Sequence, residues 1–126
     1  MNKQVIFSSK APEPIGPYSQ AILVKDTLFV SGQIGMNAES RELVTDNLAD
    51  EVTQVMNNIG YILEEANMSF DNVVKSTIYI NDMNIYLLVN EIYGSYFREN
   101  PPAREMVEVS WLPKDVNVEI SCIAER

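Results

Sequence analysis

Two runs of alternating apolar and polar residues close the sequence and constrain its fold more than any other feature. They span residues 103–109 and 116–124, and such alternation is typical of strands with one buried face. The apolar residues have odd numbers in the first run and even numbers in the second. If both sets cover one core, Arg104 and Glu119 share the opposite face of a sheet, because successive side chains of a strand alternate between faces. The plainer alternative is that these charges simply face water.

Four further strands are expected at residues 3–7, 21–24, 27–30 and 73–80. The dipeptide Lys25-Asp26 is typical of a tight hairpin between the second and third of the six strands. Ser31-Gly32-Gln33 is expected to end the third strand, and residues 35–44 read as irregular.

Apolar residues at helical spacing predict two amphipathic helices, over residues 47–66 and 85–97. For the longer one, Asp46 or Asn47 can cap the start and Asn67 can end it in the left-handed conformation. Close packing is expected at Gly60, and four acids are expected on the outer side: Asp50, Glu51, Glu64 and Glu65. Each helix has one apolar stripe, so both are expected on one face of a six-stranded sheet, an α+β fold. The uncovered face, which we expect to include Met106 and Ile123, suits a contact between subunits.

The length of 126 residues suits a single domain over residues 1–126. A net charge of −9 opposes nonspecific nucleic-acid binding. The chain has no histidine, and its one cysteine, Cys122, falls on the core parity of its run, so neither a metal site nor a disulfide is expected. No signal peptide or membrane-spanning segment is evident, which makes the cytoplasm the default location.

Several short motifs, taken together, resemble the RidA family, also called YjgF/YER057c/UK114. They occur in the order and spacing of that family over nearly the whole chain. They are Ile15-Gly16-Pro17-Tyr18-Ser19-Gln20, Ser31-Gly32-Gln33-Ile34, Asn90, Pro102-Ala103-Arg104, Val107-Glu108-Val109, and Leu112-Pro113-Lys114-Asp115-Val116 with Glu119.

The resemblance implies a chorismate-mutase-like (YjgF-like) fold, with a six-stranded mixed sheet in which the last strand is inserted between earlier ones. It also implies a homotrimer with the sheets packed inward and ligand clefts between subunits. Enzymes of the family are 2-iminobutanoate/2-iminopropanoate deaminases. They hydrolyse reactive imino or enamino acids such as 2-aminoacrylate to 2-keto acids and ammonia, without a cofactor. The partners expected are therefore a small imino or keto acid and further copies of the chain, with no nucleic acid and no membrane.

The resemblance also assigns roles to individual residues. Arg104 matches the arginine that binds the substrate carboxylate, and its alternative is an ion pair with a neighbouring acid. Glu119 matches the glutamate that positions or deprotonates water, and its alternative is a buried charge bonded to a hydroxyl. Tyr18 matches a tyrosine of the cleft, although its ring could serve packing alone. Ser31, Gly32 and Asn90 match residues near the ligand, although a turn and a surface amide are the plain alternatives.

This chain departs from many family members immediately after the arginine. A small residue and then cysteine are common there, whereas this chain has Glu105 and Met106. The backbone N–H of Met106 could still meet the carboxylate, and the bulkier side chain is expected to change which substrate side chains fit.

Two other functions compete with the deaminase. One is noncatalytic binding of a small keto or amino acid, or protection of other proteins, and this needs only the arginine. The other is the ribonuclease or translation-inhibitor activity ascribed to some relatives, which the acidic balance and the lack of histidine disfavour.

Overall fold

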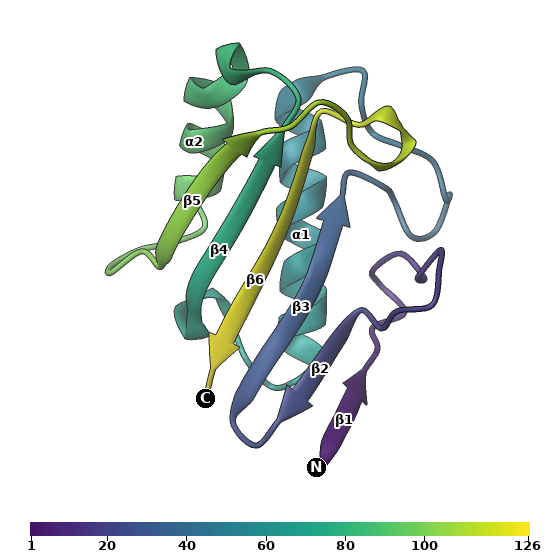
Figure 1. The fold of residues 1–126 in the computed structure, drawn as a ribbon, viewed down its shortest axis with the longest axis vertical. Coiled ribbons are helices and arrows are strands. Elements are labelled where there is room, and N and C mark those ends of the chain that lie inside the picture. Colours follow the sequence, from purple (N-terminus) through teal and green to yellow (C-terminus); the bar gives the residue numbers. More distant parts are fainter.

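The computed structural model describes residues 1–126, and a six-stranded sheet organises it (Figure 1). The strands are β1 (Lys3–Ile6), β2 (Ala21–Val24), β3 (Thr27–Ile34), β4 (Val73–Ile80), β5 (Ala103–Glu108) and β6 (Val118–Glu125). Their order is β1-β2-β3-β6-β4-β5, and only β4 and β5 pair in parallel. The last strand is inserted between β3 and β4, so the expected mixed α+β sheet is confirmed.

Two helices, α1 (Leu48–Glu65) and α2 (Tyr86–Gly94), cover one face of this sheet (Figure 1). The Asn47 side chain caps α1 by accepting a hydrogen bond from the Asp50 N–H at 3.1 Å. At the other end Asn67 has a φ of 58°, and the N–H groups of Asn67 and Met68 bond the Glu64 and Leu63 carbonyls. Both ends of the long helix therefore lie where its capping residues predict, because these contacts satisfy groups that the helix leaves unpaired.

The core lies between the helices and the sheet and contains 22 buried residues. The apolar stripe of α1 supplies much of it, including Val52, Ile59 and Leu63. Burial of one such side chain contributes about 1.5–3 kcal/mol. A side chain at Gly60 would meet the Phe70 ring, since a Cβ there would lie 3.2 Å from it. The close packing expected at Gly60 is thus present.

The second helix is shorter than predicted. A 3-10 turn (Met83–Ile85) capped by Asp82 precedes α2, and α2 ends at Gly94. Tyr96 and Phe97 lie beyond the helix, yet the centres of their rings are 5.2 and 5.7 Å from the centre of the Phe70 ring. These two aromatic residues are apolar because they pack in this cluster, although their spacing in the sequence resembles a continuation of the helix.

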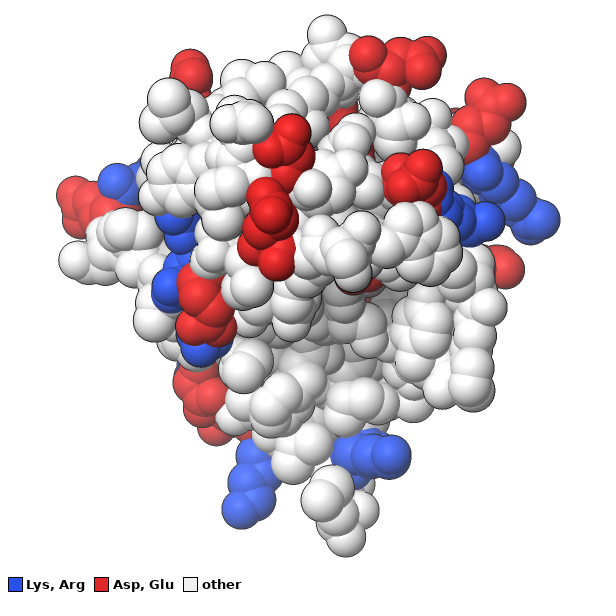
Figure 2. Space-filling model, turned by 45° about the horizontal axis from the view of Figure 1, so that its top comes forward, with Lys and Arg blue, Asp and Glu red and all other residues white.

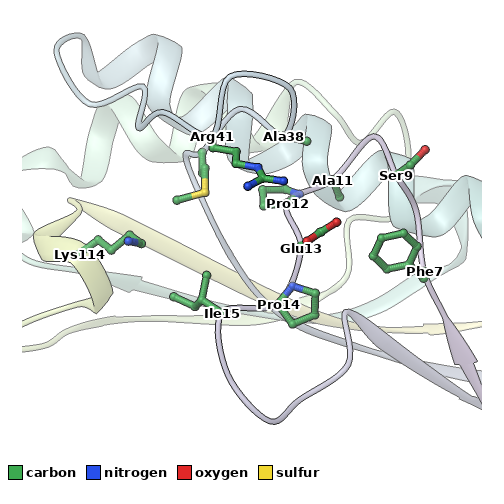
Figure 3. A pocket seen from close by; sticks show the side chains of 11 residues that line it. Phe7, Ser9, Ala11, Pro12, Glu13, Pro14, Ile15, Ala38, Arg41 and Lys114 are labelled. Atoms are coloured by element: carbon green, nitrogen blue, oxygen red, sulfur yellow. The ribbon is translucent and has the colours of Figure 1, made fainter.

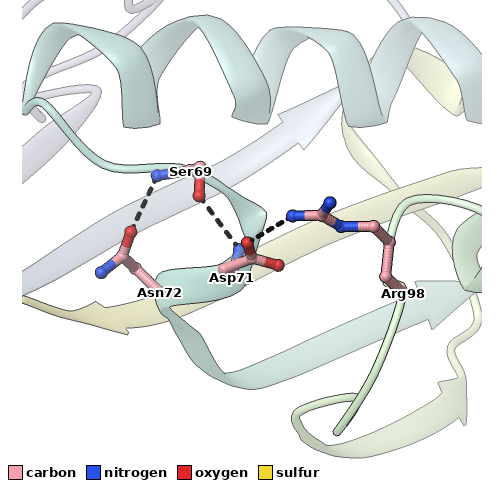
Figure 4. A network of polar contacts seen from close by, with 4 residues as sticks. All are labelled: Ser69, Asp71, Asn72 and Arg98. Atoms are coloured by element: carbon pink, nitrogen blue, oxygen red, sulfur yellow. Dashed lines mark hydrogen bonds and ion pairs between the residues drawn. The ribbon is translucent and has the colours of Figure 1, made fainter.

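The segment after α2 is joined to the start of β4 by polar contacts (Figure 4). Arg98 pairs with Asp71 at 2.9 Å, and Ser69 and Asn72 cap the 3-10 turn Phe70–Asn72. The ion pair is largely exposed, so it contributes at most about 1 kcal/mol.

The strand β3 continues through Ser31-Gly32-Gln33 to Ile34. The prediction that these three residues end the strand is therefore wrong. Val30 pairs with Cys122 and Gln33 with Ile120, so β3 advances three residues while β6 advances two. The extra residue forms a bulge at Ser31 and Gly32. Glycine and serine here therefore bend the strand without ending it.

The other face of the sheet has no covering element. Val5, Ile22, Phe29 and Ile123 lie side by side across β1, β2, β3 and β6 on this face. Val5 and Phe29 are 60% and 47% exposed. The face is partly apolar, as expected, and we call it the open face.

No helix in the structure combines the length and apolar character needed to cross a membrane.

Candidate functional site

Arg104 lies on the helix-covered face of the sheet. In the parallel pairing of β4 and β5, Ser76 is beside Arg104 and Ile78 is beside Met106. Ser76 and Ile78 are buried in the core, whereas Val107 is 41% exposed. The parity prediction for this strand is therefore wrong. Its apolar odd-numbered residues do not mark the core, because β5 is an edge strand whose outer face is itself partly apolar.

Side chains of α2 surround the Arg104 guanidinium. Its Nη1 donates to Asn90 Oδ1 at 2.8 Å, and its Nη2 lies 3.4 Å from the Tyr86 hydroxyl. The guanidinium carbon lies 5.3 Å from the centre of the Tyr93 ring, within range of a cation–π attraction. Burial raises the pKa of Tyr93 above its ordinary value, so this ring stays neutral.

Arg104 has no carboxylate partner within the chain. The two ion pairs of the structure join Lys75 to Glu105 and Arg98 to Asp71. The alternative that Arg104 belongs to an ion pair is therefore not met within one chain. A guanidinium edge without an acid partner can bind an external carboxylate.

Asn90 and Met106 accompany Arg104 on this face. Asn90 uses its side-chain oxygen on the arginine and so is more than a surface amide. Met106 is partly buried and packs against the core, so the expectation that it lies on the open face is wrong.

Glu119 lies on the open face of β6, between Ile34 of β3 and Tyr79 of β4. It lines a hollow of about 340 Å³ together with Tyr18, Ser31 and Gly32. Glu119 is half-buried, and this burial raises the pKa of its carboxyl above the ordinary value. No hydroxyl of the chain hydrogen-bonds it, so the alternative of a hydroxyl-bonded structural charge is not met within one chain.

Gly32 leaves the space that the Glu119 carboxylate occupies. A Cβ at Gly32 would lie 2.8 Å from the carboxyl carbon and from one of its oxygens. Real side chains do not approach so closely, so any residue larger than glycine would displace the carboxylate. The absence of a side chain at Gly32 therefore allows the Glu119 carboxylate to lie close to the backbone of β3.

Tyr18 stands at the rim of the hollow. Its hydroxyl accepts a hydrogen bond from the Ile15 N–H at 3.3 Å, and the residue is 47% exposed. The ring is therefore not packed away. Ser31 donates its hydroxyl to the Ser19 carbonyl at 2.6 Å, which fastens the Tyr18 loop to the bulge of β3.

Gln20 holds this loop from inside, a role that the sequence did not reveal. Its side-chain oxygen accepts from the Ser8 N–H at 2.7 Å, and its side-chain nitrogen donates to the carbonyls of Ser8, Ala11 and Pro12. It is 2% exposed. A glutamine beside a predicted strand gives no signal of such a network, because its partners are backbone groups eight to twelve residues away.

Glu51 anchors the segment that leads into β6. It is fully buried and accepts hydrogen bonds from the Asn117 N–H at 2.9 Å and the Asn117 side chain at 2.6 Å. The prediction that Glu51 faces outward is wrong. A signal existed: Glu51 is three residues from Leu48 and four from Val55, which is the spacing of the apolar stripe.

The seven candidate residues thus form two groups on opposite faces of one sheet. Arg104, Asn90 and Met106 lie on the covered side, and Glu119, Tyr18, Ser31 and Gly32 lie on the open side. The expectation that Arg104 and Glu119 share a face is wrong. One copy of the chain therefore cannot bring both groups to one small substrate.

The structure has neither a continuous basic surface on the face shown in Figure 2 nor a cluster of metal-ligating side chains among its acidic and cysteine residues. On the face shown in Figure 2, basic side chains are interspersed with acidic ones and form no continuous stripe. No group of three or more His, Cys, Asp or Glu residues is arranged to hold a metal ion.

Comparisons with known proteins cover almost the whole chain. A family model described as Endoribonuclease L-PSP matches residues 8–126. A RutC family protein of Pyrococcus abyssi is 51% identical over 126 residues, covering 100% of this chain and 99% of that protein. The human 2-iminobutanoate/2-iminopropanoate deaminase is 48% identical over 122 residues, covering 97% and 89%. The crystal structure of a Rid family protein of unknown function from Yersinia pestis has a TM-score of 0.96 at 44% identity, covering 99% and 100%.

Proposed function

The chain belongs to the RidA (YjgF/YER057c/UK114) family, and from this premise we propose that it is a 2-iminobutanoate/2-iminopropanoate deaminase. It hydrolyses reactive 2-imino acids and their enamine tautomers, such as 2-aminoacrylate, to 2-keto acids and ammonia. One observation carries the proposal: two reactive groups of opposite charge, Arg104 and Glu119, have no ionic partner within the chain. The name of the human relative supports the choice of reaction.

Arg104 binds the substrate in this proposal. Its guanidinium donates two parallel hydrogen bonds to the substrate carboxylate, a charge-assisted contact worth about 1.5–3 kcal/mol. Asn90 holds one edge of the guanidinium, which leaves other N–H groups for the ligand. Met106 lies two residues further along β5 on the same face and packs against the core, and its backbone N–H is a second candidate contact for the carboxylate.

Glu119 supplies the proton chemistry. It takes a proton from water as the water oxygen bonds to the C=N carbon, and that proton passes to the nitrogen, which gives a carbinolamine with a hydroxyl and an amino group. Glu119 then takes the hydroxyl proton and delivers it to the amino nitrogen, the C–N bond breaks, ammonia leaves, and the carbon keeps the oxygen as a keto group. A carboxyl with a raised pKa suits both steps, because it accepts and releases a proton more evenly near neutral pH. Tyr18 and Ser31 line the water side of the hollow.

The two groups meet only if two copies of the chain share the site. We therefore propose a homotrimer whose open faces pack inward, with Arg104 of one protomer directed toward the Glu119 hollow of the next. The exposed apolar residues of the open face support this arrangement, since such a patch gains free energy on burial. Light scattering at micromolar concentration is expected to give a trimer, and a monomer would contradict the proposal. A cytoplasmic location stays a prediction.

The decisive experiment generates 2-aminoacrylate in situ with a pyridoxal-phosphate-dependent dehydratase and follows release of the keto acid. Addition of this protein is expected to accelerate release, and both Arg104→Ala and Glu119→Ala are expected to abolish the acceleration. Arg98→Ala and Glu64→Ala, at exposed positions, serve as matched controls. A noncatalytic binding protein would bind keto acids but cause no acceleration.

The description of the family model names a second activity, cleavage of RNA. The net charge of −9 and the interspersed charges of Figure 2 oppose it. RNA cleavage that survives extensive purification and disappears in one point variant would favour it over the deaminase.

A further inference from the structure

A second cavity, separate from the candidate residues, lies next to the hollow. Its volume is about 350 Å³, and three loops form it: residues 7–15, residues 36–41 and the turn at Lys114 (Figure 3). Its apolar wall includes Phe7, Pro14, Ile15 and Met36. None of the seven candidate residues lines it, and Ile15 is its only lining residue in common with the hollow.

Two cations enter this cavity from different loops. Figure 3 shows the guanidinium of Arg41 and the side chain of Lys114 directed toward the same space. Neither takes part in either ion pair of the structure. Glu13 is the one acid in the lining, so the lining carries a net charge of +1 in a chain of −9. A cavity of this kind favours an anion.

The backbone at both cations is strained. Arg41 has a φ of 62° and Lys114 has a φ of 55°, in the left-handed region that favours glycine. Strained backbone of this kind is concentrated at ligand sites, where the surrounding structure holds it in place. Two long cationic residues thus occupy the two positions around one cavity where glycine would be less strained.

We propose that this cavity binds a small organic anion, a carboxylate attached to a short apolar body. The carboxylate lies between Arg41 and Lys114, and the apolar body lies on Phe7, Ile15 and Met36. The volume is at the lower end for ligand pockets, which limits the ligand to a small molecule. This inference does not depend on the deaminase proposal.

The test uses isovalerate as the probe, with isovaleramide as its uncharged isostere and acetate as the carboxylate without the apolar body. Two-dimensional amide NMR spectra of the full-length protein are recorded during each titration. We expect isovalerate to shift the amides of residues 9–15, 36–41 and 114–115 in a saturable way. Isovaleramide is expected to give no saturable shift in these segments, and acetate is expected to bind more weakly than isovalerate.

Variants separate this cavity from the candidate active site. Arg41→Gln and Lys114→Gln are each expected to weaken isovalerate binding by about 2- to 5-fold, the range for one exposed charge contact. Arg41→Lys and Lys114→Arg retain the charge and are expected to retain binding. Glu13→Gln is expected to strengthen binding, and Arg104→Gln to leave these shifts unchanged.

Three results would overturn the proposal. The first is the absence of a saturable shift at millimolar isovalerate. The second is an equal response to isovaleramide, which would mean binding to apolar surface alone. The third is loss of the shifts in Arg104→Gln together with their retention in both glutamine variants of the cavity, which would assign binding to the arginine site.

Discussion

The two faces of the sheet hold the two halves of the candidate site by different means. Arg104 is held by side chains of one helix, at positions 86, 90 and 93, the i, i+4, i+7 spacing of a single helical face. Glu119 lies instead against backbone. The bulge at Gly32 borders its carboxyl, and the neighbouring loop is held in place by hydrogen bonds from the Gln20 side chain. The charge of Arg104 therefore lies among polar and aromatic side chains, whereas the carboxyl of Glu119 is partly shielded from water.

The largest expected effect lies on the open face. Glu119→Gln keeps the shape of the side chain but cannot accept a proton from water. We expect a 10²- to 10⁴-fold loss of kcat, the usual contribution of general-base catalysis. Steady-state kinetics with 2-aminoacrylate generated in situ measures it. Unchanged kcat would mean that the open face takes no part in the chemistry.

The second prediction tests whether the halves act across chains. Arg104→Ala and Glu119→Ala are each expected to be inactive, but mixed trimers of the two variants contain some sites with both intact groups. If each site takes its arginine from one protomer and its glutamate from the next, random mixing restores about one quarter of the wild-type activity. Dissociation and refolding of the mixed variants, followed by the same assay, checks this. No recovery in verified mixed trimers would contradict a shared site.

On the covered face, Arg104→Lys retains the positive charge but loses the planar fork. We expect kcat/KM to fall by about 10- to 100-fold, mostly through KM, because a lysine cannot bind a carboxylate in two places. Arg98→Lys, at a highly exposed ion pair, is the control and is expected to stay near wild type. Activity of Arg104→Lys within twofold of wild type would refute the role of the guanidinium.

A change at Gly32 probes the backbone enclosure itself. Gly32→Ala places a Cβ 2.8 Å from the Glu119 carboxyl, so the carboxylate has to move and we expect a loss of activity. The destabilisation is expected to stay below about 1 kcal/mol, because the carboxylate is the end of a flexible side chain and not part of a packed core. Gly94→Ala is the matched control, since no atom lies within 4 Å of a Cβ there. The deaminase assay and thermal unfolding of both variants measure the two effects, and unchanged activity of Gly32→Ala would show that the position of the carboxylate is not needed.

The smallest effect is a pH-dependent change in stability. Burial raises the pKa of Glu119, so the folded state holds its proton at a higher pH than the unfolded chain does. This contribution to stability is complete below the unfolded pKa and is lost as the pH rises through the folded pKa. Glu119→Gln is therefore expected to be more stable than wild type at pH 7, with the difference vanishing toward pH 4. Chemical denaturation at both pH values tests it, and a difference independent of pH would contradict the burial of the charge.

The amino-acid sequence was sufficient for the order and type of the elements. Alternation and helical spacing located all six strands and both helices, and Asn47 and Asn67 marked the ends of α1. These features depend on neighbours within a few residues, so they can be read from the sequence alone. The family motifs also named seven candidate residues, whose roles stay predictions and which the structure places in two groups.

Only the tertiary structure decided which face each group occupies. Parity failed at β5 because the apolar residues of this edge strand face outward. The spacing of Glu51 matched the apolar stripe, but its partner Asn117, in a distant segment, became evident only in the structure. The bulge at Ser31 and Gly32, the Gln20 network and the Arg41–Lys114 cavity likewise join segments far apart in the sequence. Hydrogen bonds and packing between distant segments leave no local pattern, so such features emerge only when the chain has folded.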